Sequence, residues 1–285
     1  MYRKIFFALL FMPLWVWGVV PTVVNDTTSE ALYRLGLEYL TGNDSLGIYM
    51  NEEKGVELIR QAAERGSAPA QFRLALCYEE GQRVSQDYAQ AVYWYRQAAE
   101  RGDAWAQFNL AICYAKGQGV SQDYGQAFFW YRQAAEQGDV PAQYNLAGCY
   151  SKGWGIPQDY ERAVYWYRRA AEQGDAWAQY GLAGCYAEGE GVSQDYGQAV
   201  YWYRQAAEQG DARAQHNLAV CYAEGQGVSQ DYGQAIYWWR KSAEQGDAEA
   251  QYSLGICYEE GLGVNQDSKQ AEYWKNLAIQ NGYQP

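Results

Sequence analysis

The chain has 285 residues and a formal net charge of −12, with 34 Asp and Glu against 22 Lys and Arg. Because phosphate binding requires clustered Lys and Arg, this balance disfavours nucleic acid as a partner. Aromatic residues make up 16% of the chain, and most of them recur at fixed positions, which indicates a role in packing.

The N-terminal segment has the form of a secretory signal. Arg3 and Lys4 precede an apolar run of 16 uncharged residues, Ile5 to Val20. This run is shorter than the roughly 20 residues that a membrane-spanning helix needs, and Pro13 weakens it further as a helix. We therefore expect residues 1–24 to be the cleaved signal peptide of an exported protein. The alternative is an uncleaved N-terminal anchor, which would be the protein's membrane tether.

A 36-residue unit, seen clearly at 103–138, repeats along the rest of the chain. In its first half, apolar residues follow the spacing of a helix that begins after Asp103. Two glycines then allow the chain to turn. Asp123 is expected to cap a second helix, with Gln126 reaching back to the backbone of the cap. Neither helix can bury its apolar side alone, so neighbouring units must stack.

Seven units are predicted from this period. The first, 29–66, is degenerate and longer in its loop, as expected of a terminal unit that faces water on one side. The last, 247–282, changes the end of its second helix and is interpreted as the C-terminal cap. The regular units between them are 67–102, 103–138, 139–174, 175–210 and 211–246.

One cysteine occurs at the same place in each of the six later units: Cys77, Cys113, Cys149, Cys185, Cys221 and Cys257. Equivalent atoms of stacked units lie about 8–10 Å apart, whereas a disulfide needs Cα atoms within about 7 Å. We therefore expect six free, buried thiols. No C-x-x-C motif occurs and the chain has a single histidine, so neither a metal site nor a cofactor is predicted.

No catalytic constellation is predicted. His216 replaces an aromatic residue of the other units, and no nucleophile or orienting carboxylate is placed beside it. The recurrent aspartates, such as Asp87 and Asp123, are read as helix caps because a residue needed in every copy is structural. Neither a phosphate-binding loop nor a nucleophile elbow is present.

The unit pattern A-x-A-Q-x-x-L-A-x-C-Y-x-x-G-x-G-V-x-Q-D-Y-x-Q-A-x-x-W-Y-R-Q-A-A-E-x-G resembles the Sel1-like repeat, a relative of the tetratricopeptide repeat, over residues 29–282. The resemblance implies an all-α fold, a right-handed α/α superhelical solenoid of about seven helix–turn–helix repeats. It also implies that the first helices line the concave side and that the protein is a scaffold for protein complexes in the cell envelope. Together with the signal-like segment, the resemblance implies an exported bacterial protein, periplasmic or secreted.

If the protein binds a partner, specificity should lie where the units differ. On the first helices, one variable series faces away from the apolar side: Pro69, Trp105, Pro141, Trp177, Arg213 and Glu249. A neighbouring series offers amide groups to an extended peptide: Asn109, Asn145 and Asn217. Exposed Trp and Arg are enriched in interface hot spots, so Trp105, Trp177 and Arg213 are the first candidates. The alternative is that these side chains pack against the adjacent unit.

The predicted function is a non-catalytic scaffold that binds a protein or extended peptide on its concave face. The alternative is a β-lactam-binding or β-lactam-hydrolysing enzyme, because one secreted, cysteine-rich subgroup of the family it resembles has that activity. Members of that subgroup carry two cysteines per unit joined within the unit, whereas this sequence has one.

Overall fold

The computed structural model describes residues 28–284, and the regular secondary structure of this part is almost entirely helical. Within it there are fourteen α-helices and one short 3₁₀ helix, η1 (Asp44–Leu46). The strand-like pairing there is limited to an isolated bridge between Asn43 and Ile48. The predicted all-α solenoid is confirmed, and the signal or anchor expected at 1–24 lies outside the described residues.

Each predicted unit contains two antiparallel helices. The first helices are α1 (Ser29–Thr41), α3 (Ala68–Glu80), α5 (Ala104–Lys116), α7 (Val140–Lys152), α9 (Ala176–Glu188), α11 (Ala212–Glu224) and α13 (Ala248–Glu260). The second helices are α2 (Glu52–Glu64), α4 (Tyr88–Glu100), α6 (Tyr124–Glu136), α8 (Tyr160–Ala171), α10 (Tyr196–Glu208), α12 (Tyr232–Glu244) and α14 (Ser268–Gln280).

Capping residues explain where these helices begin and end. Asp103 Oδ1 accepts a hydrogen bond from the Ala106 N–H at 2.8 Å, and Asp123 Oδ1 accepts one from the Gln126 N–H at 3.0 Å. Gly117, in the left-handed conformation at φ 69°, ends α5. We expected the Gln126 side chain to accept a hydrogen bond from the Asp123 N–H, and this expectation was wrong. The Asp123 N–H donates instead to the carbonyl of Tyr114, at 3.0 Å.

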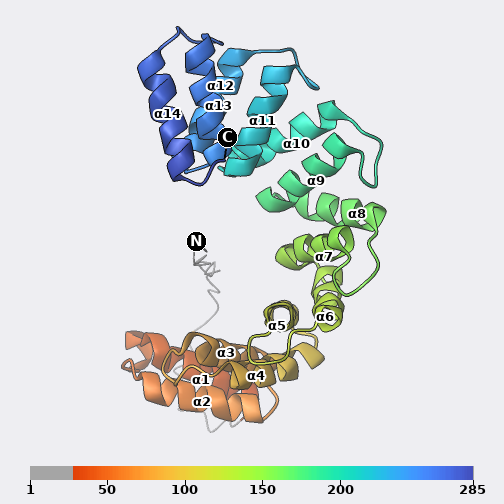
Figure 1. Cartoon of the computed structure of the whole chain (residues 1–285). Coiled ribbons are helices and arrows are strands. Elements are labelled where there is room, and N and C mark those ends of the chain that lie inside the picture. Colours follow the sequence, from red (N-terminus) through yellow and green to blue (C-terminus); the bar gives the residue numbers. More distant parts are fainter. Residues whose placement is uncertain (1–27, 285) are drawn as a thin grey trace.

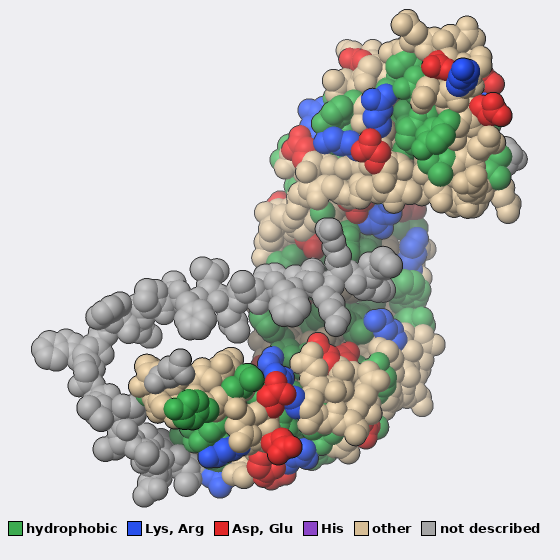
Figure 2. Space-filling view, turned by 90° about the vertical axis from the view of Figure 1, so that its left-hand side faces the viewer, with side chains coloured by type: hydrophobic (Ala, Val, Ile, Leu, Met, Phe, Trp, Pro, Cys, Tyr) green, Lys and Arg blue, Asp and Glu red, His purple; other side chains and the backbone are tan. Residues whose placement is uncertain are grey.

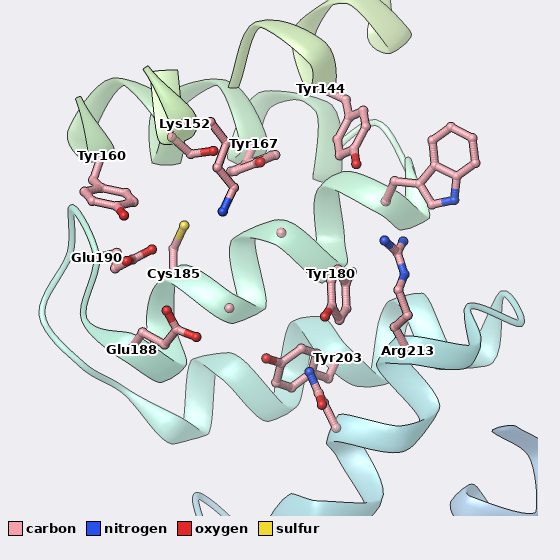
Figure 3. A pocket seen from close by; sticks show the side chains of 15 residues that line it. Tyr144, Lys152, Tyr160, Tyr167, Tyr180, Cys185, Glu188, Glu190, Tyr203 and Arg213 are labelled. Atoms are coloured by element: carbon pink, nitrogen blue, oxygen red, sulfur yellow. The ribbon is translucent and has the colours of Figure 1, made fainter. Parts of the chain in front are cut away.

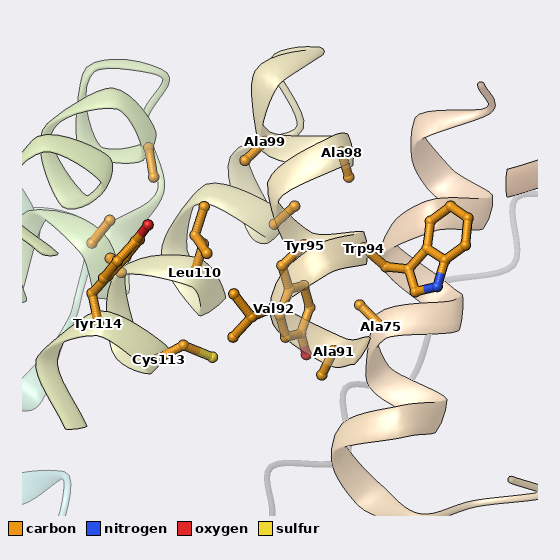
Figure 4. Close-up of a cluster of buried hydrophobic side chains, with 14 of the residues drawn as sticks. Ala75, Ala91, Val92, Trp94, Tyr95, Ala98, Ala99, Leu110, Cys113 and Tyr114 are labelled. Carbon is orange, nitrogen blue, oxygen red and sulfur yellow. The ribbon is translucent and has the colours of Figure 1, made fainter. Parts of the chain in front are cut away.

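Small side chains bring neighbouring helices close together. Figure 4 shows α4, which presents Ala91, Val92 and Tyr95 between α3 on one side and α5 on the other. Leu110 and Cys113 of α5 are buried in the same cluster, with 0% and 2% of their surface exposed. Each helix from α2 to α13 therefore packs against both the preceding and the following helix.

The units stack into an open arc (Figure 1). In this view α5, α7 and α9 line the inner side of the arc, and α6, α8 and α10 lie on its outer side. At the C-terminal end, α14 buries only Ala271 and Ala278, and Tyr283 stacks on Tyr252 with a ring-centroid distance of 4.2 Å. None of the helices between residues 28 and 284 is both long and apolar enough to span a bilayer.

Candidate functional site

The variable residues Trp105 and Trp177 lie in the first turns of α5 and α9 and expose 58% and 49% of their surface. Each ring also touches a ring of the preceding unit. Trp105 meets Phe72 edge-on at a centroid distance of 6.0 Å, and Trp177 meets Tyr144 at 5.8 Å. Both interpretations of these tryptophans therefore have a physical basis, since one side packs on the neighbouring unit and the other is open to solvent.

The same contact recurs with different chemistry in the following units. Arg213 lies over the ring of Tyr180 at 4.4 Å from its centroid, a cation–π contact. One unit later, Glu249 Oε2 lies 3.5 Å from Nε2 of His216, and Asp247 Oδ1 lies 3.7 Å from its Nδ1. The expectation that no carboxylate lies beside His216 was therefore wrong, because the next unit supplies both carboxylates. Arg213 and Glu249 each follow their partner by 33 residues in the sequence. His216 therefore faces an acidic residue in the position where Tyr180 faces an arginine.

The three candidate asparagines divide into two kinds. Asn109 and Asn145 each donate a side-chain N–H to a carbonyl of their own helix, to Trp105 O at 2.9 Å and to Pro141 O at 2.8 Å. Asn217 instead forms a hydrogen bond with the side chain of Tyr203 in the preceding unit. The amide series is thus partly engaged within the protein, and its members are not equivalent.

A hollow of about 260 Å³ opens among α7, α8, α9, α10 and α11 (Figure 3). Three of the predicted residues line it: Trp177, Arg213 and Asn217. The other three, Trp105, Asn109 and Asn145, lie outside it. The sequence analysis missed several other side chains that line the hollow, including Tyr144, Lys152, Tyr167, Glu188, Glu190 and Tyr203.

The hollow exists because two glycines occupy one face of α9. Gly181 replaces the asparagine found at 109, 145 and 217, and Gly184 replaces an aliphatic residue such as Ile112. A Cβ atom at Gly184 would meet nothing within 4 Å, whereas one at Gly181 would lie 2.9 Å from the ring of Tyr167. Tyr167 therefore uses part of the space that the missing side chain leaves, and the rest is open. Unit 175–210 alone among the six later units has glycine at both positions.

The charged groups of the hollow are arranged along α9. At the end where α9 begins, the Arg213 guanidinium binds Asp211 Oδ2 at 2.8 Å and hydrogen-bonds the Tyr144 phenol. At the other end lie Glu188 and Glu190. Figure 3 shows the Lys152 ammonium directed into the hollow from α7. The Glu190 side chain hydrogen-bonds Tyr160 and raises the pKa of that phenol.

Two side chains that line the hollow, Tyr167 and Cys185, remain neutral at pH 7. Burial raises the pKa of Tyr167 to about 12, and that of the Cys185 thiol likewise to about 12. A protonated thiol is a weak nucleophile, so Cys185 is not activated for covalent chemistry. The neutral phenols can donate hydrogen bonds to a bound molecule.

All six cysteines are free and buried, as predicted. Between residues 28 and 284, no group of three or more His, Cys, Asp and Glu side chains is close enough to hold a metal ion. The open side of the arc, seen in Figure 2, carries Lys and Arg side chains interspersed with Asp and Glu on its visible parts.

Comparison with protein families gives seven consecutive matches to the model described as Sel1 repeat. The matched residues are 29–67, 68–103, 106–139, 140–175, 178–211, 212–247 and 248–283. Comparison with curated proteins gave no match.

Two solved structures are similar over most of the chain. One is c5321, a protective antigen present in uropathogenic Escherichia coli strains and displaying an SLR fold, with 38% identity and a TM-score of 0.81 over 89% of this chain. This chain spans about half of that protein, 54% of its length. The other is a Sel1 repeat protein from Oxalobacter formigenes, with 34% identity and a TM-score of 0.74 over 89% of this chain and 99% of that one.

Proposed function

Because the chain belongs to the Sel1-repeat family, we propose that it is a non-catalytic scaffold which binds a protein or an extended peptide on the inner side of its arc. The observation that supports this most is the distribution of variable residues. Side chains shared by the units, such as Leu110 and Leu182, are fully buried, whereas Trp105 and Trp177 are half exposed on the inner helices. Specific binding needs exposed residues that differ between units, and these residues meet that requirement.

The proposed place of action is the cell envelope, outside the cytoplasm. This rests on the charge and apolar pattern of residues 1–24. Cleavage after residue 24 would remove Arg3 and Lys4 and leave 20 Lys and Arg against 34 Asp and Glu, a net charge of −14. Such a scaffold would repel strongly acidic partners at long range, so a neutral or basic protein surface is the favoured partner.

Site-specific photocrosslinking in cells tests the binding face. A photoreactive amino acid placed at Trp105, Trp177 or Arg213 should give adducts with a discrete protein in the envelope fraction, because these positions face the proposed partner. The matched control places the same group at Tyr93 or Tyr201, which are both 52% exposed on second helices. Adducts identified by mass spectrometry that form equally well from the control positions, or from those positions alone, would contradict the proposal.

A further inference from the structure

One of the six junctions between neighbouring units is held together differently from the rest. At the other five, an arginine of the second helix donates a hydrogen bond to a tyrosine phenol of the next unit, 18 residues later in the sequence. These pairs are Arg60–Tyr78, Arg96–Tyr114, Arg168–Tyr186, Arg204–Tyr222 and Arg240–Tyr258. The junction between α6 and α7 has the same two residues, Arg132 and Tyr150, but this bond is absent there in the described part of the chain.

Two side chains that contact Tyr150 account for the missing bond. Phe128, which replaces the valine of units 67–102, 139–174 and 175–210, meets the Tyr150 ring edge-on at a centroid distance of 5.4 Å. Arg162, which replaces the glutamine of the other later units, lies over the same ring at 5.7 Å from its centroid. An aromatic ring and a like charge thus separate Arg132 from the phenol. Within residues 28–284, the buried Nε of Arg132 has no hydrogen bond and lies 3.7 Å from Glu136 Oε1.

The inner side of the same junction lacks a second contact. Trp105 and Trp177 each meet a ring of the preceding unit. At this junction the equivalent residue is Pro141, which brings neither an aromatic ring nor a charge to Phe108. The ring contact that Phe108 makes within residues 28–284 is with Tyr131 of its own unit, at a centroid distance of 6.0 Å. No other junction in the described part of the chain lacks both the arginine bond and the inner contact.

The contacts that remain at this junction hold the two units together but fix their angle less firmly. Trp154, which no other unit has at its loop position, stacks on Tyr124 of the preceding unit at a centroid distance of 5.7 Å. Aromatic rings attract one another over centroid distances of about 4.5–7 Å, whereas a hydrogen bond requires a narrow range of distance and angle. The Gln143 side chain donates to the Ala135 carbonyl at 3.3 Å, the longest of the six equivalent bonds.

The position of this junction gives it leverage over the shape of the molecule. Helices α6 and α7 lie midway along the arc (Figure 1). Trp105 belongs to the unit before the junction, and Trp177 and Arg213 belong to units after it. A small rotation between α6 and α7 therefore changes the distance between these candidate binding residues, and also the opening between the two ends of the arc.

We propose that the junction between α6 and α7 is a hinge, about which residues 28–138 and residues 139–284 turn as two bodies to open and close the arc. The hydrogen-bonded junctions on either side keep each body rigid. This inference goes beyond the proposed scaffold function, because the motion belongs to the chain itself and is measured without a partner. In a scaffold, closure of the hinge brings both halves of the inner side onto one bound molecule.

Pulsed electron paramagnetic resonance between two spin labels on the full-length protein tests the hinge. Labels at Tyr93→Cys and Tyr165→Cys span the hinge and one regular junction, whereas labels at Tyr201→Cys and Tyr273→Cys span two regular junctions. These four tyrosines are 52–56% exposed, and the six native cysteines are at most 4% exposed, so the label attaches to the introduced thiols. The distance distribution of the first pair should be about twice as wide as that of the second. Equal widths would overturn the inference.

Restoring the missing bond gives a second, independent readout. Phe128→Val together with Arg162→Gln gives this junction the valine and glutamine of a regular one, so that Arg132 reaches the Tyr150 phenol. The first pair's distribution should then narrow to the width of the second. Adding Tyr150→Phe to this background removes the acceptor and should widen the distribution again, whereas Tyr150→Phe alone should not change it. A double variant that stays wide, or one that stays narrow after Tyr150→Phe, would contradict the proposed hinge.

Discussion

At the scale of single residues, a buried glutamine links each unit to its neighbour. In unit 103–138, Gln107 donates through Nε2 to the carbonyl of Ala99 in the preceding unit at 3.1 Å. It also accepts a hydrogen bond from Gln137 Nε2 at 2.8 Å. The same pair of bonds recurs at Gln143, Gln179, Gln215 and Gln251. A buried amide with both of its groups bonded is stabilising, whereas an unbonded group costs free energy.

The first copy of this arrangement is incomplete. Gln71 donates to the Ala63 carbonyl at 3.0 Å, but its Oε1 is buried and has no partner in the described part of the chain. The donor that the other units use is replaced here by Arg101, which bonds the carbonyl of Gln97. Arg101→Gln should therefore raise the free energy of unfolding by about 1 kcal/mol, measured by urea denaturation.

The reverse change provides the control for that prediction. Gln137→Arg removes the donor from a complete copy and should lower the free energy of unfolding by about 1–2 kcal/mol, because it leaves the buried Gln107 oxygen unsatisfied. If both substitutions left the unfolding curve unchanged, the glutamine pair would have no part in holding the units together.

At the scale of the structural elements, the loop between the two helices of a unit locks onto the preceding unit. Gly191 has a φ of +71°, and a Cβ atom there would lie 2.3 Å from the backbone carbonyl carbon of Tyr160, at the start of α8. The equivalent glycines of other units, Gly119, Gly155 and Gly227, make the same approach, each to the unit just before its own. Arg83 takes this place only where the partner is the atypical first unit, and its guanidinium pairs with Glu52 at 3.0 Å.

Two glycines with positive φ, Gly174 and Gly191, can distinguish the cost of the loop contact from the cost of the backbone conformation. Gly174 has a φ of +93°, and an added Cβ would meet nothing within 4 Å. Gly174→Ala should cost only the left-handed conformation, about 1–2 kcal/mol. Gly191→Ala should cost about 1–3 kcal/mol more, because the loop must move away from α8. Urea denaturation of the two variants measures the difference, and equal losses would show that the loop does not lock the units.

At the scale of the whole molecule, stability comes from neighbouring units in turn, because each helix packs mainly on those before and after it in the sequence. Each of the six later units contains one buried thiol, so ionisation of the thiols affects the stability of most of the array. Burial raises the pKa of Cys113, Cys149 and Cys185 to about 12, and that of Cys221 and Cys257 to about 11.

These shifts predict a loss of stability in alkali. Below about pH 8.5, the usual pKa of a free thiol, both the folded and unfolded chains keep their thiols protonated. Between that value and about pH 11–12 the unfolded chain loses these protons and the folded chain retains them, so the free energy of unfolding must fall as pH rises. Urea denaturation at pH 8 and pH 10.5 measures the fall.

A variant with all six cysteines replaced by alanine isolates the contribution of the thiols. Its free energy of unfolding should fall less between the two pH values, with the remaining loss due to tyrosines such as Tyr167, whose pKa burial also raises. An equal fall in the two proteins would assign the whole effect to tyrosine and contradict the role of the thiols.

The sequence by itself determined what depends on contacts within one unit or between identical units. The caps at Asp103 and Asp123, the turn at Gly117 and the burial of the cysteines all follow from local hydrogen bonds and a 36-residue apolar pattern. Helical periodicity also selected Trp177, Arg213 and Asn217, which line one hollow in the structure. Their role in binding stays a prediction.

Only the tertiary structure decided which of the variable residues meet. Lys152 and Glu188 belong to different units, and their approach to one hollow depends on how α7 and α9 pack, which no periodic pattern encodes. The glycine pair at 181 and 184 was visible in the sequence, but a missing side chain opens a space only if its neighbours do not close it. Tyr167 closes part of that space and leaves the rest open, an outcome set by side-chain geometry in three dimensions.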